Sequence, residues 1–393
     1  MRKSSYPSKY LLSLLLNLSS VDKMSTEARN EDVCDFIKNV CKGTLYTCEC
    51  RSADVCEAVI DFGNLEKNFV ECYKALSNAE IAMISQPHPL GAKIYLQKLK
   101  HKRPHFHKML SLLLFIVTLA SVFWTGTLIA QGNFELLKEI GLETKLPSTY
   151  SWAATYALSI MGILGLHELG HIIASARCIG SWSPPLFIPA PGFGLGTFGA
   201  IVTSRFRPST PTCLALLGIS GPALGFTISL LVLMVGALTS IYVSPELLPP
   251  AETLHSIPLI SLLAWLVVPG AEGKAMIPNA AAFAGVIMIY IHFLNLLPIG
   301  QLDGGHVVAS IIGPNTSRFI SLITLILILV YALLYPTDLI LIAAIFAVLA
   351  FFLTGLRRHP GAACNLYESR IKRAIIATFY VLMLGLSVPV PIS

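Results

Sequence analysis

The stretch Trp152–Ala176 reads WAATYALSIMGILGLHELGHIIASA and is apolar for most of its length. Glu168 is its one acidic residue, and His167 and His171 stand before and after it. A run of about 20 apolar residues is long enough to cross the hydrocarbon core of a bilayer as a helix. Ionisable side chains at that depth are costly, so they mark a functional site by default. The stretch therefore predicts a membrane helix that carries chemistry.

The composition of the whole chain agrees with a membrane protein. The 393 residues are 54% apolar and only 13% charged, whereas soluble domains carry about 25% charged residues. Residues 1–107 hold 15 Lys and Arg and 12 Asp and Glu, while 108–393 hold only 13 and 10. We therefore expect a soluble N-terminal domain over 25–107 and a membrane-embedded domain over 108–393, with its core at 152–315. The net charge of +6 is explained first by membrane topology, so the lipid bilayer, and no nucleic acid, is the expected partner.

The first 24 residues contain a short apolar run, Tyr10–Leu18, behind three basic residues. No small-residue cleavage site follows this run, as it would in a secretory signal peptide. Met24 opens a more ordinary polar segment. We interpret 1–24 as a disordered extension or a mis-called start.

Seven apolar stretches predict membrane-spanning helices. They are Met109–Ala130, Trp152–Ala176, Thr212–Val243, Met276–Leu302, Phe319–Tyr335, Leu339–Leu356 and Ala374–Val388. The predicted fold class is an α-helical polytopic membrane protein of about seven transmembrane helices, with a small N-terminal α+β domain. Fourteen basic residues fall on one side of these spans and three on the other. Because basic loops stay in the cytosol, we expect a multi-pass protein of the cell (cytoplasmic) membrane with a cytosolic N-terminus.

Two further apolar stretches are not regular spans. Pro184–Gly199 holds four Pro and four Gly in 16 residues, so it predicts a re-entrant β-hairpin loop that protein must cover. Residues 197–203 are strand-like and could offer a free strand edge to an unwound substrate, although a purely structural loop is the alternative. Thr253–Ala271 is broken by Pro258. We expect it at the outer interface or re-entering the membrane, because a full crossing would put Asp303 a bilayer away from the two histidines.

The motif His167-Glu168-Leu169-Gly170-His171 has the H-E-x-x-H pattern. On a helix, positions i and i+4 share a face, so both imidazoles can bind one Zn²⁺ while Glu168 serves as general base. A catalytic zinc needs a third protein ligand. Asp303 lies at depth in Asn295–Gly305, where Pro298 and several glycines break the helix. A His₂Asp site for one zinc ion per chain is therefore predicted.

With these motifs the chain resembles the site-2 protease family of intramembrane zinc metalloproteases, nearest its archaeal and plastid branch. The matching pieces are His167–His171, the hairpin Pro189–Val202, Ser220-Gly221-Pro222 and Asn295–Gly305, in the family's order. The resemblance implies peptide-bond hydrolysis within transmembrane helices of single-pass proteins. It implies His167, His171 and Asp303 as metal ligands and Glu168 as the catalytic base. The candidate substrate-binding residues are Asn295, Gly196, Thr197, Phe198, Gly199 and Ala200.

Other interpretations stay open at this point. A transporter or metal carrier would use the histidines and the aspartate as a transport site, but the inverted repeats typical of transporters are not evident. A catalytically silent membrane scaffold would not need the complete motif. Asn295 could be a helix-packing amide, and we interpret His292 as a packing histidine and Gly221 and Gly225 as a close helix contact. Oligomeric state is not predicted.

Six of the nine cysteines lie in the N-terminal domain. Their spacing is not that of a zinc ribbon. We interpret them as reduced, mostly buried thiols, since a disulfide set would require an oxidising compartment or a hyperthermophile. Around them, the sequence predicts strands at 43–50, 80–85 and 92–100 and a helix at 64–77.

Overall fold

The computed structural model describes residues 34–391 except for short gaps. The gaps are 36, 53–54, 64–65, 100–103, 143–146, 193, 203, 249–254, 257–267, 269, 271–272, 367–368 and 389. The chain divides into two compact units, Met1–Lys100 and His101–Ser393. The predicted extension 1–24 and most of Thr253–Ala271 lie outside the described residues.

The N-terminal unit is an antiparallel sheet with one long helix. Its elements are β1 (Thr44–Ser52), β2 (Val55–Asp61), α3 (Glu66–Asn78), β3 (Ile81–His88) and β4 (Gly91–Lys98). The strand order is β1-β2-β4-β3. One face of α3 is buried, and it includes Phe69 and Leu76. The α+β organisation is thus present. However, β2 is an additional strand that the sequence did not predict.

The cysteines of this unit are paired rather than free. Cys34 bonds Cys48, Cys41 bonds Cys72 and Cys50 bonds Cys56. The prediction of reduced thiols was therefore wrong. For Cys50 and Cys56 the cause is the unpredicted strand β2, because it places Cys56 directly opposite Cys50 across the β1–β2 hairpin.

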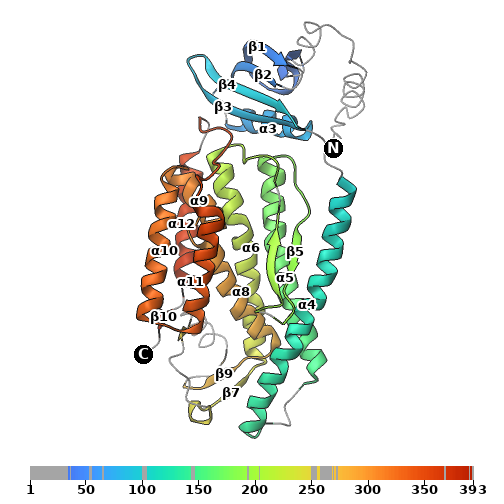
Figure 1. The fold of residues 1–393 in the computed structure, drawn as a ribbon, viewed down its shortest axis with the longest axis vertical. Helices are drawn as coiled ribbons and strands as arrows, with labels where there is room; N and C mark the ends of the chain where they lie inside the picture. Colours follow the sequence, from blue (N-terminus) through green and yellow to red (C-terminus); the bar gives the residue numbers. More distant parts are fainter. Residues whose placement is uncertain are drawn as a thin grey trace. The chain divides into compact units, whose positions relative to one another are not determined.

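Helices dominate the second unit (Figure 1). They are α4 (Pro104–Glu139), α5 (Thr149–Cys178), α6 (Pro211–Leu238), α8 (Ala280–Leu296), α9 (Asp303–Ile312), α10 (Ser317–Leu334), α11 (Asp338–Ala350) with the π-helical turn η3 (Phe351–Gly355), and α12 (Arg370–Ser387). α6 packs against α5, α8, α9 and α12, so it lies at the centre of the unit. One apolar core joins α6 to α8–α12, and a second joins α4, α5 and α8.

A helix occupies each of the seven ranges predicted to span a membrane. Among the described residues, four helices are long and apolar enough to cross: His107–Glu139, Thr149–Cys178, Pro211–Leu238 and Ser317–Leu334. Large apolar side chains cover their outer faces, such as Leu333 of α10, which is 82% exposed. Lipid-facing helices require such apolar outer surfaces, whereas soluble monomers rarely show them.

Two predicted spans are shorter than expected. α6 ends at Leu238 because residues Ile241–Val243 form a strand, β7, instead of a further helical turn. β7 pairs antiparallel with β9 (Ala275–Ile277), which occupies the predicted start of the next helix. Asn279 then caps α8, its side chain accepting a hydrogen bond from the backbone N–H of Ala282. A short two-stranded sheet therefore replaces the ends of both helices.

The stretch rich in proline and glycine folds as a β-hairpin. β5 (Leu186–Pro189) pairs antiparallel with β6 (Thr197–Ile201), and β6 lies within 197–203, the range predicted to be strand-like. The hairpin is fastened to α4, where the Ser121 hydroxyl donates to the Gly196 carbonyl at 2.7 Å and accepts from the Ala190 N–H. A disulfide, Cys178–Cys213, joins the end of α5 to the start of α6. The hairpin is thereby anchored beside α5, the helix that carries the histidines.

Candidate active site

His167 and His171 lie one turn apart near the end of α5, and their rings face a common point. The two Nε2 atoms are 3.0 Å apart, and the ring centroids are 4.8 Å apart. His167 is 3% exposed and therefore almost removed from solvent. The helix thus presents two nitrogen ligands on one face, as the i, i+4 spacing predicts.

Asp303 brings an oxygen ligand to the same point from α9. Its Oδ2 lies 3.4 Å from the Nε2 of His167, and its Oδ1 lies 3.4 Å from the Nε2 of His171. The chain returns to this point because α8 ends at Leu296 and α9 begins at Asp303, with Pro298 in the break. The three side chains form the one His, Cys, Asp and Glu cluster suited to a metal among the described residues.

The donor set and its spacing fit a zinc ion. A tetrahedral zinc with bonds of about 2.0–2.2 Å separates its ligand atoms by about 3.3–3.6 Å. Each Nε2 atom lies 3.4 Å from a different oxygen of Asp303, and the two Nε2 atoms are 3.0 Å apart. The Nδ1–H of His171 donates to the Leu217 carbonyl at 3.0 Å, which leaves the lone pair on Nε2 directed at the common point. Taken as one ligand atom per residue, the three atoms lie within 4.8 Å of one another, so small side-chain movements would let the three residues hold zinc.

Two glycines of α6 make room for the imidazole rings. A Cβ at Gly221 would lie 2.6 Å from Cε1 and 2.7 Å from Cδ2 of His171. A Cβ at Gly225 would lie 2.9 Å from Cε1 of His292 and 3.0 Å from the Cβ of His167. Sequence reasoning assigned this pair to helix packing, and it missed that the groups packed there are histidine rings. No spacing rule could have indicated this contact, since it joins three helices.

Glu168 and two further histidines surround the cluster. Glu168 follows His167 on α5 and is 5% exposed. The backbone N–H of Gly361 donates to Nδ1 of His359, and burial lowers the pKa of His359 to about 3. The neutral ring must therefore carry its proton on Nε2, which lies 2.8 Å from Nδ1 of His306 and donates to it. The segment after η3 thus holds His306, one turn beyond Asp303, in a fixed orientation.

The predicted substrate-binding residues fall into two groups. Asn295 is half-buried on α8, one turn beyond His292. In the hairpin, Thr197 is buried and its hydroxyl donates to the Ile188 carbonyl at 2.9 Å, whereas Phe198 is 64% exposed. Gly196 is buried against α4, where a Cβ would meet the Cα of Val122 at 2.6 Å.

The two remaining hairpin residues, Gly199 and Ala200, are half-buried on β6. Ala200 is the partner of Phe187 in β5, and among the described residues β6 pairs with this one strand only. The other edge of β6 has no strand partner in the described part of the chain. Substrate binding by all six residues stays a prediction.

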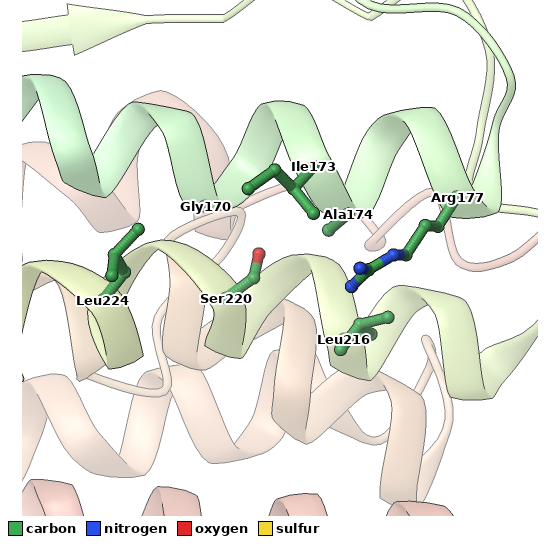
Figure 2. Close-up of a pocket in the computed structure, with 7 residues that line it drawn as sticks. All are labelled: Gly170, Ile173, Ala174, Arg177, Leu216, Ser220 and Leu224. Atoms are coloured by element: carbon green, nitrogen blue, oxygen red, sulfur yellow. The ribbon is translucent and has the colours of Figure 1, made fainter.

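A groove lies between α5 and α6, and Figure 2 shows the residues that line it. Its volume is about 180 Å³. The lining residues are Gly170, Ile173, Ala174, Arg177, Leu216, Ser220 and Leu224. None of the three candidate ligands lines the groove, so it is separate from the metal site.

Comparison with known proteins agrees with this geometry. The family model for peptidase family M50 matches residues 155–334, a range that contains His167, Glu168, His171 and Asp303. Residues 155–334, a little under half of the chain, are thus similar to peptidase family M50. This is the site-2 protease family that the sequence motifs resemble, so the expected resemblance is supported. Together with this match, the long apolar helices indicate a multi-pass membrane protein.

Several plant proteins are similar to this chain. "Probable zinc metalloprotease EGY2, chloroplastic" of Arabidopsis thaliana is 29% identical over 194 residues, which are 48% of this chain and 32% of the relative. "Probable zinc metalloprotease EGY1, chloroplastic" of the same plant is 31% identical over 42% of this chain and 30% of its own length. The EGY1 protein of Oryza sativa subsp. japonica is 29% identical over 53% of this chain and 38% of its own length. The chain thus spans about a third of these relatives. No solved structure matches it significantly.

Proposed function

We propose that this chain is a zinc metallopeptidase that hydrolyses peptide bonds within the transmembrane helices of single-pass membrane proteins. The observation that carries the proposal is the convergence of His167 and His171, in the second half of a membrane helix, with Asp303, while Glu168 stands beside the histidines. The plant relatives, which are named as probable zinc metalloproteases, support it. One zinc ion per chain is expected, because one triangle of ligands is present in the described residues.

Each residue has a defined task in this reaction. His167, His171 and Asp303 would hold the ion. When bound, the ion would lower the pKa of a water molecule and polarise the carbonyl of the peptide bond to be cut. Glu168 takes the proton of the attacking water and returns it to the leaving amine. The low exposure of His167 and Glu168 excludes bulk solvent and strengthens the electrostatic interactions within the site.

The hairpin is proposed to prepare the substrate. A helix cannot be cut while its carbonyls are bonded within the helix, and unpaired backbone groups in lipid cost several kcal/mol each. The free edge of β6 could pair with these groups as an added strand. The candidate residues are Gly196, Thr197, Phe198, Gly199 and Ala200, together with Asn295 on α8.

The full membrane topology is also part of the proposal. We propose seven spans, a re-entrant hairpin, a membrane domain over 108–393 and a cytosolic N-terminal domain over 25–107, in a cell membrane. The distribution of basic residues supports this orientation. Disulfides in the N-terminal unit are compatible with a cytosolic location in hyperthermophiles, whose intracellular proteins are rich in disulfides.

The test is cleavage of a single-pass helical substrate by the purified full chain. We expect cleavage inside the helix that stops with a zinc chelator and returns on adding zinc. The Glu168→Gln variant should keep one zinc per chain but lose cleavage by at least about 100-fold, because it lacks the general base. Full activity in this variant would refute the protease assignment and leave a transport or scaffold role.

A further inference from the structure

His292 is fully buried on α8 and packs against a candidate zinc ligand. Its exposure is 0%, and its ring centroid lies 5.0 Å from that of His167. The sequence gives no hint of this contact, because the two residues are 125 positions apart and each belongs to a different helix. A packing histidine explains the burial but leaves the chemistry of both rings unaccounted for.

Each of the two rings has one buried nitrogen without a partner. Nδ1 of His167 and Nε2 of His292 have no hydrogen-bond partner among the described residues. A buried polar atom left unpaired costs about 1–3 kcal/mol. Two such atoms on neighbouring rings therefore call for a common explanation.

The proton positions of the two rings are complementary. Nδ1 of His292 contacts the Met288 carbonyl, and a carbonyl only accepts, so this nitrogen carries the proton. The neutral His292 ring then has a free lone pair on Nε2. Nε2 of His167 faces the common point of the three candidate ligands, so the proton of the neutral His167 ring must be on Nδ1. Nδ1–H of His167 is thus a hydrogen-bond donor, and Nε2 of His292 is an acceptor.

Gly225 of α6 lies against both histidines. A Cβ at Gly225 would meet the Cβ of His167 at 3.0 Å and Cε1 of His292 at 2.9 Å, with Nε2 of His292 closer still. Nε2 of His292 is therefore near the Cβ of His167, and Nδ1 is the ring nitrogen of His167 nearer to that Cβ. The two unpartnered nitrogens do not bond each other in this structure, so the rings would have to turn to bring them together.

We infer that His292 is a positioning residue for the metal site, and that its Nε2 accepts a hydrogen bond from Nδ1–H of His167 when the site holds its metal. The resulting series of hydrogen bonds links the metal site through His167 and His292 to the Met288 carbonyl. It fixes the tautomer and the ring orientation of His167, as the Leu217 carbonyl does for His171. This inference rests on the proposed zinc site. It adds a residue outside the H-E-x-x-H and Asp303 motifs.

The test compares glutamine and methionine at position 292 in the full chain. The two side chains have nearly the same shape, but only glutamine places an acceptor oxygen where Nε2 stands. Zinc affinity is measured by competition with a chelator in detergent. We expect His292→Met to weaken zinc binding by about 10–100-fold, as loss of an outer-shell partner does. His292→Gln should stay within about threefold of wild type.

Several outcomes would overturn the inference. Equal zinc affinity in His292→Met and wild type would remove the positioning role, and failure of His292→Gln to restore binding would show that the imidazole itself is needed. If His292→Met does not fold, Gly225→Ala displaces the His292 ring instead and should weaken zinc binding, whereas unchanged binding contradicts the role. A wild-type chain that binds no zinc would refute the proposed function as well.

Discussion

We expect the Gly221→Ala variant to lose most of its affinity for zinc, because the new methyl group would occupy the place of the His171 ring. The added Cβ would lie 2.6 Å from Cε1, whereas ordinary contact begins at 3.4 Å. Cε1 would have to retreat by about 0.8 Å and Nε2, which lies nearer still, by more, whereas the tolerance on a metal–ligand distance is about 0.2 Å. This movement of the His171 ring would also break the hydrogen bond that it donates to the carbonyl of Leu217, which lies on α6 with Gly221.

The expected loss exceeds that of an outer-shell change. Because one of three ligands is displaced, zinc affinity should fall by at least about 100-fold, or about 2.7 kcal/mol. The assay is chelator competition on the purified full chain. Gly162→Ala is the matched control: Gly162 lies on α5 with nothing within 4 Å of a Cβ, so zinc binding should not change. A Gly221→Ala chain that binds zinc within about threefold of wild type would refute this placement of the ring.

Three further changes test other parts of the molecule. His167→Ala should lose both zinc and cleavage, measured by metal analysis and substrate assay; retained zinc would contradict its role as a ligand. Ala200→Pro should lower turnover at least about 10-fold with zinc content unchanged, because proline removes a backbone donor of β6; unchanged turnover would argue against strand addition. Replacing Cys41 and Cys72 by alanine should lower the free energy of unfolding of the N-terminal unit by about 2–5 kcal/mol, since their bond closes a loop across 31 positions. Thermal unfolding of the full chain would measure this loss, and an unchanged midpoint would contradict it.

Local signals in the sequence account for most of the membrane unit. Long apolar runs predict the helices, and the motif at His167–His171 depends only on helical spacing. The break after Leu296 follows from the rigid ring of Pro298 and the nearby glycines. Helix ends were less predictable, because pairing between β7 and β9 is a contact between distant segments.

Features set by tertiary contact could not be predicted. Strand β2 has a run of buried residues, Ala58–Ile60, in place of the alternation that identifies a half-buried strand. Without β2, the pairing of Cys50 with Cys56 was not visible, and disulfide connectivity does not follow from spacing alone. The sequence supports only the interpretation of His292 as a packing histidine, because nothing in the neighbouring residues distinguishes such a histidine from one that contacts a metal-ligating side chain.

The Cys178–Cys213 bond has a consequence for the integrity of the chain. It closes a covalent ring across 35 positions, and the whole β5–β6 hairpin lies inside that ring. In the chain-entropy model such a closure removes about 4 kcal/mol of freedom from the unfolded chain. A protease that nicks the hairpin would therefore leave two fragments that migrate together until a reductant separates them. The halves carrying α5 and α6 stay tethered even when the peptide between them is cut.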